Sequence, residues 1–363
     1  KKMRKDMLDG KPLPSACERC VSKQQNNLNT MRTGLNSKWY DETKDLIAKT
    51  AEDGTLSELQ LKYWDFRFSN YCNLACTTCS PLFSTQWSKD FQKLHPGADK
   101  YSETQLIDLK EANVFWEDIE DNLETMKEIH FAGGEPLIMP EHWRILNMLD
   151  ERKKYDIALR YSTNGTTLGQ KKQNVMEMWK KFDYVHLSIS IDGEGDAFEH
   201  IRYKGKWDQT LANLKTIRAS RAVDFWFHPT VSILNIFRLT ELHHELHIND
   251  LMPLESVHPL RGFHMENYWV DRFHINPLFT PEYYSITVLP ELLKEQAADK
   301  ITKYGKKLEA DTGIPFSGWQ NIIDFMYQHD NSHLWKQFKW KSKQIDDIRN
   351  TDVFELNPEL RNG

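Results

Sequence analysis

From residue 61 onward, short apolar runs alternate with longer segments in which apolar residues recur at helical spacing. This alternation predicts a parallel α/β architecture, in which strands and helices follow one another in turn. Strands are predicted over residues 61–68, 128–131, 157–162, 184–191, 223–233 and 251–257. Helices are predicted over residues 103–126 (with Leu106, Leu109, Val114 and Ile119 as apolar side chains), 207–219, 237–246, 281–304 and 319–343, and another begins near residue 140.

Each predicted strand ends in a polar motif, and this placement favours a partial barrel. In α/β barrels the loops at the carboxyl ends of the strands carry the active site. We therefore predict an α/β fold with a partial (β/α)6 TIM-type barrel over residues 56–260. A polar segment, 1–55, precedes the barrel, and an irregular and helical extension, 261–363, closes its open side.

The composition of the 363 residues narrows the classes of partner. Lys and Arg number 47 and Asp and Glu number 53, which gives a net charge of −6, and the sequence has no dense basic run. Non-specific electrostatic binding to nucleic acid is therefore not indicated. No apolar run is long enough to span a bilayer and no signal peptide is visible, which predicts a cytoplasmic protein. The sequence starts at Lys1 in helix-like residues without an initiator Met, so we expect a fragment whose upstream part is absent.

Three of the five cysteines, Cys72, Cys76 and Cys79, form a C-x3-C-x2-C array directly after the first predicted strand. Three thiolates on one tight loop can each take a different iron of a four-iron four-sulfur cluster, whereas an electron-transfer cluster of that type uses four cysteines. One iron is then open to a substrate or cofactor. Disulfides are disfavoured by the odd number of cysteines, and a zinc site would usually have C-x2-C pairs and a fourth ligand.

The array resembles that of the radical SAM enzymes, although Thr78 stands where an aromatic residue commonly precedes the last cysteine. The resemblance implies that Cys72, Cys76 and Cys79 hold a 4Fe-4S cluster whose open iron chelates S-adenosyl-L-methionine (SAM). It also implies that one electron from an external flavodoxin-like or ferredoxin-like reductant cleaves SAM. The resulting 5′-deoxyadenosyl radical would abstract hydrogen from an unactivated C–H bond.

Gly133-Gly134-Glu135-Pro136, after the second predicted strand, is the most discriminating partner of the cysteine array. Glycines let a backbone approach a ligand closely, because no Cβ is in the way. In the radical SAM family the backbone of this turn accepts hydrogen bonds from the SAM amino group, and Glu135 would anchor the turn or help to receive that group. Taken alone, the same four residues are also a generic turn.

The same resemblance implies further cofactor-binding residues. Ser190 and Asp192 follow the fourth predicted strand, where the family contacts the ribose and carboxylate of SAM. Arg202 matches an arginine that pairs with that carboxylate through its planar fork. Alternatively, Asp192 stabilises its own loop, and Arg202 is an ordinary surface arginine. Residues placed near the ribose and adenine, but also compatible with a turn and plain core, are Asn164, Val231 and Ile233.

Cys17 and Cys20, in C-E-R-C, resemble the auxiliary-cluster region of the SPASM and twitch branch of radical SAM proteins. In the subgroup concerned this region precedes the barrel. Residues 1–55 would then form an incomplete auxiliary segment with two ligands of a second iron-sulfur cluster. A zinc half-site or two free thiols are also compatible with a lone C-x2-C.

The residues leave the substrate open. Members of this branch act on ribosomal peptides and proteins, and others act on sugars or nucleoside-like molecules. The resemblance therefore favours a peptide or protein side chain, with dehydrogenation of a small carbohydrate-like or nucleoside-like alcohol as an alternative. An alternative from another functional class is a non-catalytic protein whose cysteines bind zinc or a redox-sensing iron-sulfur cluster.

Histidines elsewhere form no recognisable metal motif. His243 and His247 share a helix face, but the sequence is not H-E-x-x-H and offers no third ligand, so an exposed helix face is expected. Polar residues near the predicted barrel mouth that carry no assigned role are His228, Glu255, His258 and Arg261.

Overall fold

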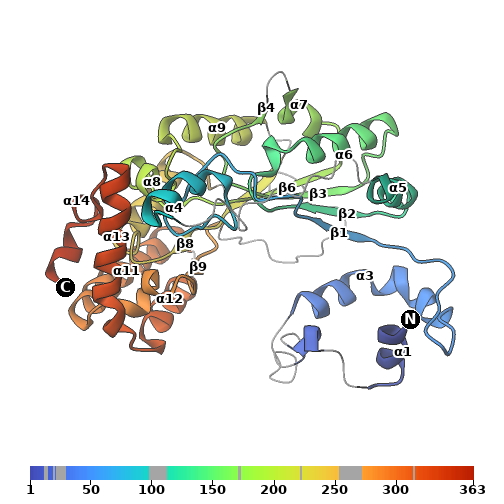
Figure 1. Ribbon diagram of the computed structural model, residues 1–363, viewed down its shortest axis with the longest axis horizontal. Helices are drawn as coiled ribbons and strands as arrows, with labels where there is room; N and C mark the ends of the chain where they lie inside the picture. Colours follow the sequence, from blue (N-terminus) through green and yellow to red (C-terminus); the bar gives the residue numbers. More distant parts are fainter. Residues whose placement is uncertain are drawn as a thin grey trace. The chain divides into compact units, whose positions relative to one another are not determined.

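The structure is a computed structural model that describes residues 1–11, 15–18, 21, 30–97, 113–170, 173–220, 223–252, 272–313 and 315–363. The chain divides into two compact units, shown in the colours of the sequence in Figure 1. The first comprises Lys1–Tyr63 and Asp121–Met126, and the second comprises Trp64–Glu120 and Lys127–Gly363. Predicted functional residues that lie outside the described residues are Cys20, Glu255, His258 and Arg261.

The first unit contains helices α1 (Lys2–Leu8) and α3 (Met31–Ala48) and the 3-10 turn η1 (Ser15–Cys17). Helix α3 begins at a capping box, in which Thr30 and Thr33 exchange hydrogen bonds between side chain and backbone. Among the side chains that the structure describes in α1 and α3, none is buried. Hydrophobic burial within these two helices therefore contributes little to their stability.

A five-stranded sheet in the order β1-β2-β3-β6-β7 is the centre of the second unit. The pairs β2–β3, β3–β6 and β6–β7 are parallel, which confirms the predicted α/β fold with a parallel, barrel-type sheet. Its strands are β1 (Tyr63–Phe66), β2 (Glu128–Phe131), β3 (Ala158–Thr163), β6 (Tyr184–Ile189) and β7 (Asp224–Phe227). Of the predicted sixth strand, residues 253–257 lie outside the described residues.

Two short strand pairs accompany this sheet. Strands β4 (Gly169–Gln170) and β5 (Gln173–Asn174) are antiparallel, and β8 (Thr230–Val231) and β9 (Asn276–Pro277) are parallel. The prediction of one continuous strand over 223–233 was wrong, since β7 ends at Phe227 and β8 begins at Thr230. The break follows from Pro229, which has no N–H to donate to a neighbouring strand.

Helices α6 (Pro140–Glu151) and α7 (Val175–Trp179) lie with α9 (Trp207–Ser220) on one side of the sheet in Figure 1. Apolar side chains of α6, among them Trp143 and Leu149, are buried. Of the apolar residues in the predicted helix before β2, Val114 is 71% exposed, whereas Ile119 is fully buried. Other helices before the extension are α4 (Ser88–Leu94), α5 (Asn113–Asn122), α8 (Gly195–Ile201) and α10 (Leu239–Ile248), with η2 (Thr85–Trp87) and η3 (Pro136–Ile138).

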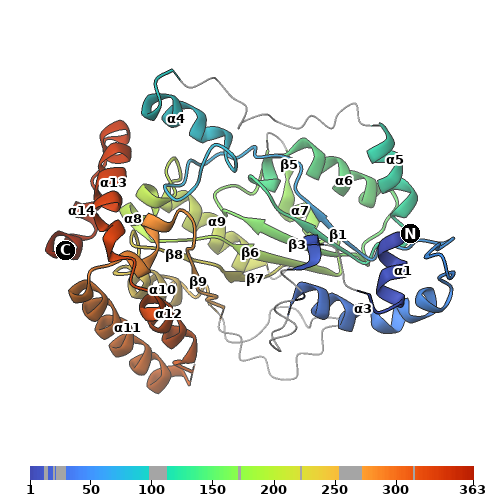
Figure 2. The same ribbon diagram turned by 60° about the horizontal axis from the view of Figure 1, so that its bottom comes forward.

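The C-terminal extension is helical, and its helices gather near β8 and β9 (Figures 1 and 2). The predicted helix over 281–304 begins only at Glu291, because residues before Pro290 form two 3-10 turns. The predicted helix over 319–343 is two helices separated by a turn. The elements are η4 (Glu282–Tyr284), η5 (Ile286–Val288), α11 (Glu291–Thr312), α12 (Ser317–Gln328), η6 (Ser332–Leu334), α13 (Trp335–Arg349), α14 (Val353–Leu356) and η7 (Pro358–Asn362). Within the described residues, no helix combines the length and apolar character that a bilayer span requires.

His243 of α10 is buried, so the predicted exposed helix face is wrong for this residue. Its Nδ1 lies 2.7 Å from the hydroxyl of Tyr304, and its ring packs against Phe273 and Trp319. Burial lowers the pKa of His243 to about 3, and the nearby His247 lowers it further. The folded protein therefore holds this imidazole neutral, whereas the unfolded chain protonates it below a pKa of about 6.5.

Replacement of His243 by Gln should make stability less sensitive to acid. Because the folded pKa is depressed, this histidine's contribution to stability is present above the unfolded pKa and is lost as the pH falls below it. Between pH 7 and pH 5, the free energy of unfolding of the wild type should fall by about 2 kcal/mol more than that of His243→Gln. Urea unfolding at the two pH values measures the difference. The control is the exposed His329→Gln, outside α10, for which we expect the wild-type dependence; equal dependence in His243→Gln and the wild type would contradict the account.

Candidate functional site

The cysteine loop, defined here as residues 70–81, follows β1 without regular secondary structure. Side chains therefore satisfy several of its carbonyl groups. Trp87 Nε1 donates to the carbonyl of Cys76 (2.8 Å), and Asn70 Nδ2 donates to the carbonyl of Pro81 (2.9 Å). Because buried backbone groups need such partners, these contacts hold the loop in one conformation.

A second segment of backbone completes this support. The N–H groups of Ala75 and Thr77 donate to the carbonyls of Tyr203 (2.9 Å) and Ile201 (2.7 Å), which end or follow helix α8. The loop is thus paired with a part of the chain that lies more than a hundred residues away in the sequence.

The loop carries the three cysteine thiols within electrostatic reach of one another. Burial raises the pKa of Cys72 to about 12, and the neighbouring Cys76 and Cys79 add to the shift. Burial also raises the pKa of Cys79 to about 11 and raises the pKa of Cys76. Neutral thiols are therefore favoured until a metal displaces their protons, as metal binding to cysteine requires.

Nitrogen donors point at two of these sulfur atoms. Asn164 Nδ2 lies 3.9 Å from Cys72 Sγ, and the backbone N–H of Leu74 lies 3.4 Å from the same sulfur. Arg202 Nη1 lies 3.8 Å from Cys76 Sγ. Hydrogen bonds to sulfur are among the factors that tune iron-sulfur clusters, so this donor set fits such a group. Among the described residues, no three His, Cys, Asp or Glu side chains converge as ligands of a single metal ion.

The glycine turn after β2, Gly133-Gly134-Glu135-Pro136, packs directly against the cysteine loop. A Cβ on Gly134 would lie 2.1 Å from the carbonyl oxygen of Tyr71, and the φ angle of Gly134 is +45°. The N–H of Glu135 donates to that same carbonyl (2.9 Å). We expected the glycines to let the backbone approach a ligand, and the neighbour that Gly134 admits in the structure is the cysteine loop itself.

Glu135 anchors this turn with both of its carboxylate oxygens. Oε1 accepts hydrogen bonds from Leu137 N (3.1 Å) and Thr163 Oγ1 (2.8 Å), and Oε2 accepts one from Asn164 N (2.7 Å). Burial raises the pKa of Glu135 to about 7, although these three hydrogen bonds oppose the shift. The carboxylate thereby ties the end of β2 to the end of β3, and Pro136 begins the 3-10 turn η3.

Asp192 stabilises the loop after β6, which is the role that the sequence offered as the alternative to SAM binding. Its carboxylate accepts from Thr230 N (2.8 Å) and pairs with Arg202 Nε (2.7 Å). Because the guanidinium also reaches Cys76, Arg202 connects this loop to the cysteine loop. The N–H of Ser190 donates to the carbonyl of Thr163 (2.9 Å), so Ser190 lies beside the end of β3. Pairing of Arg202 with a SAM carboxylate remains a prediction.

Val231 and Ile233 are fully buried, with exposed fractions of 0%. Ile233 N donates to the carbonyl of Tyr284 (2.9 Å). Asn235, which follows these two residues in the sequence, links them to the loop after β6. Its Nδ2 donates to the carbonyls of Asp192 (2.8 Å) and Thr230 (3.0 Å). The two apolar residues are thus part of the core at the end of the sheet, and their contact with adenine remains a prediction.

Cys17 lies in η1 of the first unit as a free, partly exposed cysteine. Its predicted partner, Cys20, lies outside the described residues. The second cluster therefore remains a prediction from the sequence.

A row of polar residues that the sequence-based predictions did not include lies on the face of the sheet opposite α6. His130, Arg160, His186 and Asp224 are aligned in register across β2, β3, β6 and β7. In a barrel, this face lines the interior. The signal was present in β3, where partly exposed and buried side chains alternate along the strand.

Beyond this row, the indole of Trp226 and the imidazoles of His228 and His274 form an aromatic patch. The ring centroids lie 4.7 Å apart for Trp226 and His274 and 5.3 Å apart for the two histidines. Burial lowers the pKa of His228 to about 4, and His274 lowers it further. At neutral pH these side chains therefore offer uncharged hydrogen-bonding groups at the carboxyl end of β7.

The strand ends of a parallel sheet and a three-cysteine loop lie together at this site, an arrangement typical of proteins that bind a metal cofactor. Comparison with known families agrees with this geometry. Residues 66–241 match the model of the Radical SAM superfamily. The chain therefore carries a radical SAM domain, which confirms the predicted family.

Curated relatives are more distant. GTP 3′,8-cyclase of Campylobacter lari is 26% identical over 132 residues, which are 36% of this chain and 35% of that protein. GTP 3′,8-cyclase 1 of Mycobacterium tuberculosis is 24% identical over 194 residues, 52% of this chain and 48% of that protein. The chain thus spans about a third to a half of the length of these relatives.

Solved structures with a related arrangement include SuiB of Streptococcus suis bound to S-adenosylmethionine, with a TM-score of 0.43 and 16% identity. The match covers 81% of this chain and 57% of SuiB. A structure of anSMEcpe with bound AdoMet gives a TM-score of 0.41 and 14% identity, covering 74% of this chain and 62% of that one.

Replacement of Gly134 by Ala should displace the cysteine loop. The positive φ costs an L-residue about 1–2 kcal/mol, and overpacking against the Tyr71 carbonyl adds about 1–3 kcal/mol. The matched control is Gly195→Ala, at a similar φ of +52° with no atom within 4 Å of the added Cβ. Thermal unfolding and alkylation of the loop thiols should both change more in Gly134→Ala; equal effects in the two variants would refute the steric account.

Proposed function

We propose that this protein is a radical SAM enzyme that reductively cleaves SAM and uses the 5′-deoxyadenosyl radical to abstract hydrogen from an unactivated C–H bond. The proposal is supported above all by the joint arrangement of the cysteine loop and the glycine turn. Cys72, Cys76 and Cys79 would hold a 4Fe-4S cluster that leaves one iron for SAM.

The other residues have positioning roles in this proposal. Gly134 and Glu135 fix the turn that would face the SAM amino group, and Asn164 directs its amide to Cys72. Arg202 and Asp192 brace the cysteine loop from the side of β6. The cluster and SAM supply the radical chemistry when bound, while the chain supplies orientation and exclusion of water. The electron would come from an external flavodoxin-like or ferredoxin-like protein.

For the substrate, we propose a peptide or protein side chain, bound against the polar inner face of the sheet. The patch of Trp226, His228 and His274 supports this choice, because uncharged donors and acceptors next to an aromatic surface suit amide groups and apolar side chains. Residues 1–55 with Cys17 would belong to an auxiliary-cluster segment of the SPASM/twitch type. Such a second cluster could take an electron from the substrate radical.

A nucleoside-like substrate is the second candidate function. It is supported by the relatives, which are named GTP 3′,8-cyclases. A guanine base could stack on the same aromatic patch, so the patch alone does not decide between the two classes.

Anaerobic reconstitution tests the class of enzyme. The wild-type chain should bind about four irons on the triad and, with dithionite, form 5′-deoxyadenosine from SAM. Cys76→Ala should lose this product entirely, because the cluster loses one of three thiolates. Cys17→Ala is the control for loss of a thiol elsewhere and should retain SAM cleavage. Zinc in place of iron, or no 5′-deoxyadenosine from the wild type, would favour the non-catalytic metal-binding protein.

Deuterium transfer tests the class of substrate. Candidate peptides, encoded by short reading frames beside the gene, are prepared with deuterated side chains and compared with deuterated GTP. We expect deuterium in 5′-deoxyadenosine only with a peptide, as measured by mass spectrometry. Transfer from GTP alone would overturn the peptide assignment and establish the nucleoside-like class.

A further inference from the structure

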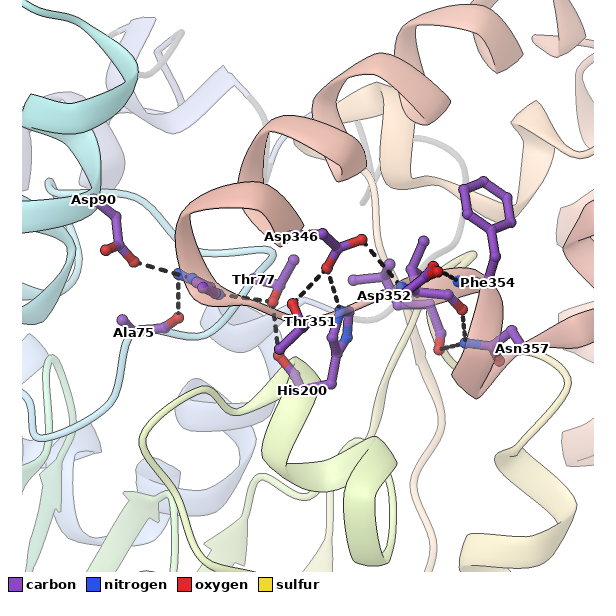
Figure 3. Close-up of polar contacts among 12 residues, drawn as sticks. Ala75, Thr77, Asp90, His200, Asp346, Thr351, Asp352, Phe354 and Asn357 are labelled. Carbon is purple, nitrogen blue, oxygen red and sulfur yellow. Dashed lines mark hydrogen bonds and ion pairs between the residues drawn. The ribbon is translucent and has the colours of Figure 1, made fainter.

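A buried arginine at the end of α13 reaches into the cysteine loop from the C-terminal extension. Arg349, with an exposed fraction of 6%, donates from Nη2 to the carbonyl of Ala75 (2.8 Å) and from Nη1 to the hydroxyl of Thr77 (3.0 Å). Both acceptors lie between the cysteines of the array. Nε donates to Asp90 Oδ2 (3.0 Å), and Figure 3 shows Asp90, Ala75 and Thr77 on this side of the helix.

Two aromatic rings enclose the same guanidinium. Its central carbon lies 4.7 Å from the ring centroid of Trp87 and 4.3 Å from that of Tyr203. Trp87 is itself bonded to the carbonyl of Cys76, and Tyr203 O accepts from Ala75 N. Arg349 therefore contacts the loop directly and also contacts both residues that support the loop backbone.

The end of α13 is fixed by a second buried contact, which Figure 3 also shows. Asp346 Oδ1 pairs with His200 Nε2 (2.9 Å) and accepts from the hydroxyl of Thr351 (2.6 Å). The hydroxyl of Thr77, which accepts from Arg349, donates to the carbonyl of His200 (2.9 Å). One network thus joins α13, α8 and the cysteine loop.

The charge of Arg349 acts on the sulfur atoms as well as on the backbone. Its guanidinium donates to Ala75 and Thr77, the two neighbours of Cys76 in the sequence. This buried cation would therefore stabilise negative charge placed on the cluster sulfurs. Reduction of a cluster adds one negative charge, so a nearby buried cation favours the reduced form.

We propose that Arg349 is a positioning residue of the cluster site, which holds the cysteine loop in the conformation that accepts the cluster and makes the bound cluster easier to reduce. The inference rests on the proposed function. It assigns to the C-terminal extension a part in the radical chemistry.

The first test uses the full chain without a cluster. In Arg349→Gln, alkylation of Cys76 and Cys79 by iodoacetamide should be at least tenfold faster than in the wild type, because the loop loses two hydrogen bonds. Lys343→Gln, which removes an exposed charge from the same helix, is the matched control and should leave the rate unchanged. Equal rates in Arg349→Gln and the wild type would overturn the loop-holding role.

The second test measures the midpoint potential of the reconstituted cluster by electron paramagnetic resonance. Arg349→Gln should lower the midpoint potential by at least about 59 mV, which corresponds to a tenfold change in the ratio of reduced to oxidised cluster for one electron. Arg349→Lys should recover most of this shift, since it keeps the charge. Asp90→Asn should raise the potential, because it removes the opposing carboxylate; a purely structural role predicts no such opposite sign.

The outcomes separate the inference from the proposed function. A wild-type chain that binds no four-iron cluster would overturn the proposed function and, with it, the effect on potential. A normal cluster whose potential is the same in Arg349→Gln, Asp90→Asn and the wild type would overturn only the present inference. If Arg349→Gln does not fold, Arg349→Lys and Asp90→Asn still decide, since the sign of the Asp90→Asn shift does not depend on that variant.

Discussion

The contact between Gly134 and the carbonyl of Tyr71 is the constraint on which the rest of the site depends. Neither loop has regular secondary structure, so their relative position comes from close packing and from the hydrogen bond of Glu135 N to Tyr71 O. The carboxylate of Glu135 extends this link to Thr163 and Asn164. One contact that excludes any side chain at position 134 thereby aligns the ends of β1, β2 and β3.

The other half of the cysteine loop depends on segments that are remote in the sequence. Ala75 and Thr77 pair with the backbone after α8, and Arg349 covers them from α13. The protein therefore orders the loop from outside, through backbone partners and a buried ion pair with Asp90.

The sequence predicted well what depends on local pattern. Strand β2 has the predicted bounds, Glu128–Phe131, and α6 begins at Pro140, because apolar spacing and a proline at the first turn are local signals. Errors arose where proline interrupts a strand or delays a helix, as at Pro229 and Pro290. At these two positions the apolar pattern continues, but the proline nitrogen has no hydrogen to donate to a strand or helix.

The pairs that complete the site could not be predicted in the same way. Arg349 and Asp90 are 259 residues apart, and no periodicity connects them. Arg202 was identified from a resemblance, but its ion pair with Asp192 becomes evident only when β6 and the segment after α8 are placed together. Burial of His243 likewise depends on Phe273 and Trp319, which come from other elements.

The inner face of the sheet extends this reasoning from cofactor to substrate. A strand buried on both faces is usually continuously apolar, whereas β3 alternates buried with partly exposed side chains. On the inner face, Arg160 and Asp224 have oppositely charged partners, Glu128 and Arg272, so their charges are balanced within the protein. Among the described residues, the rings near His228 offer uncharged hydrogen-bonding groups, and a ligand bound against them would be selected by shape and hydrogen bonding more than by charge.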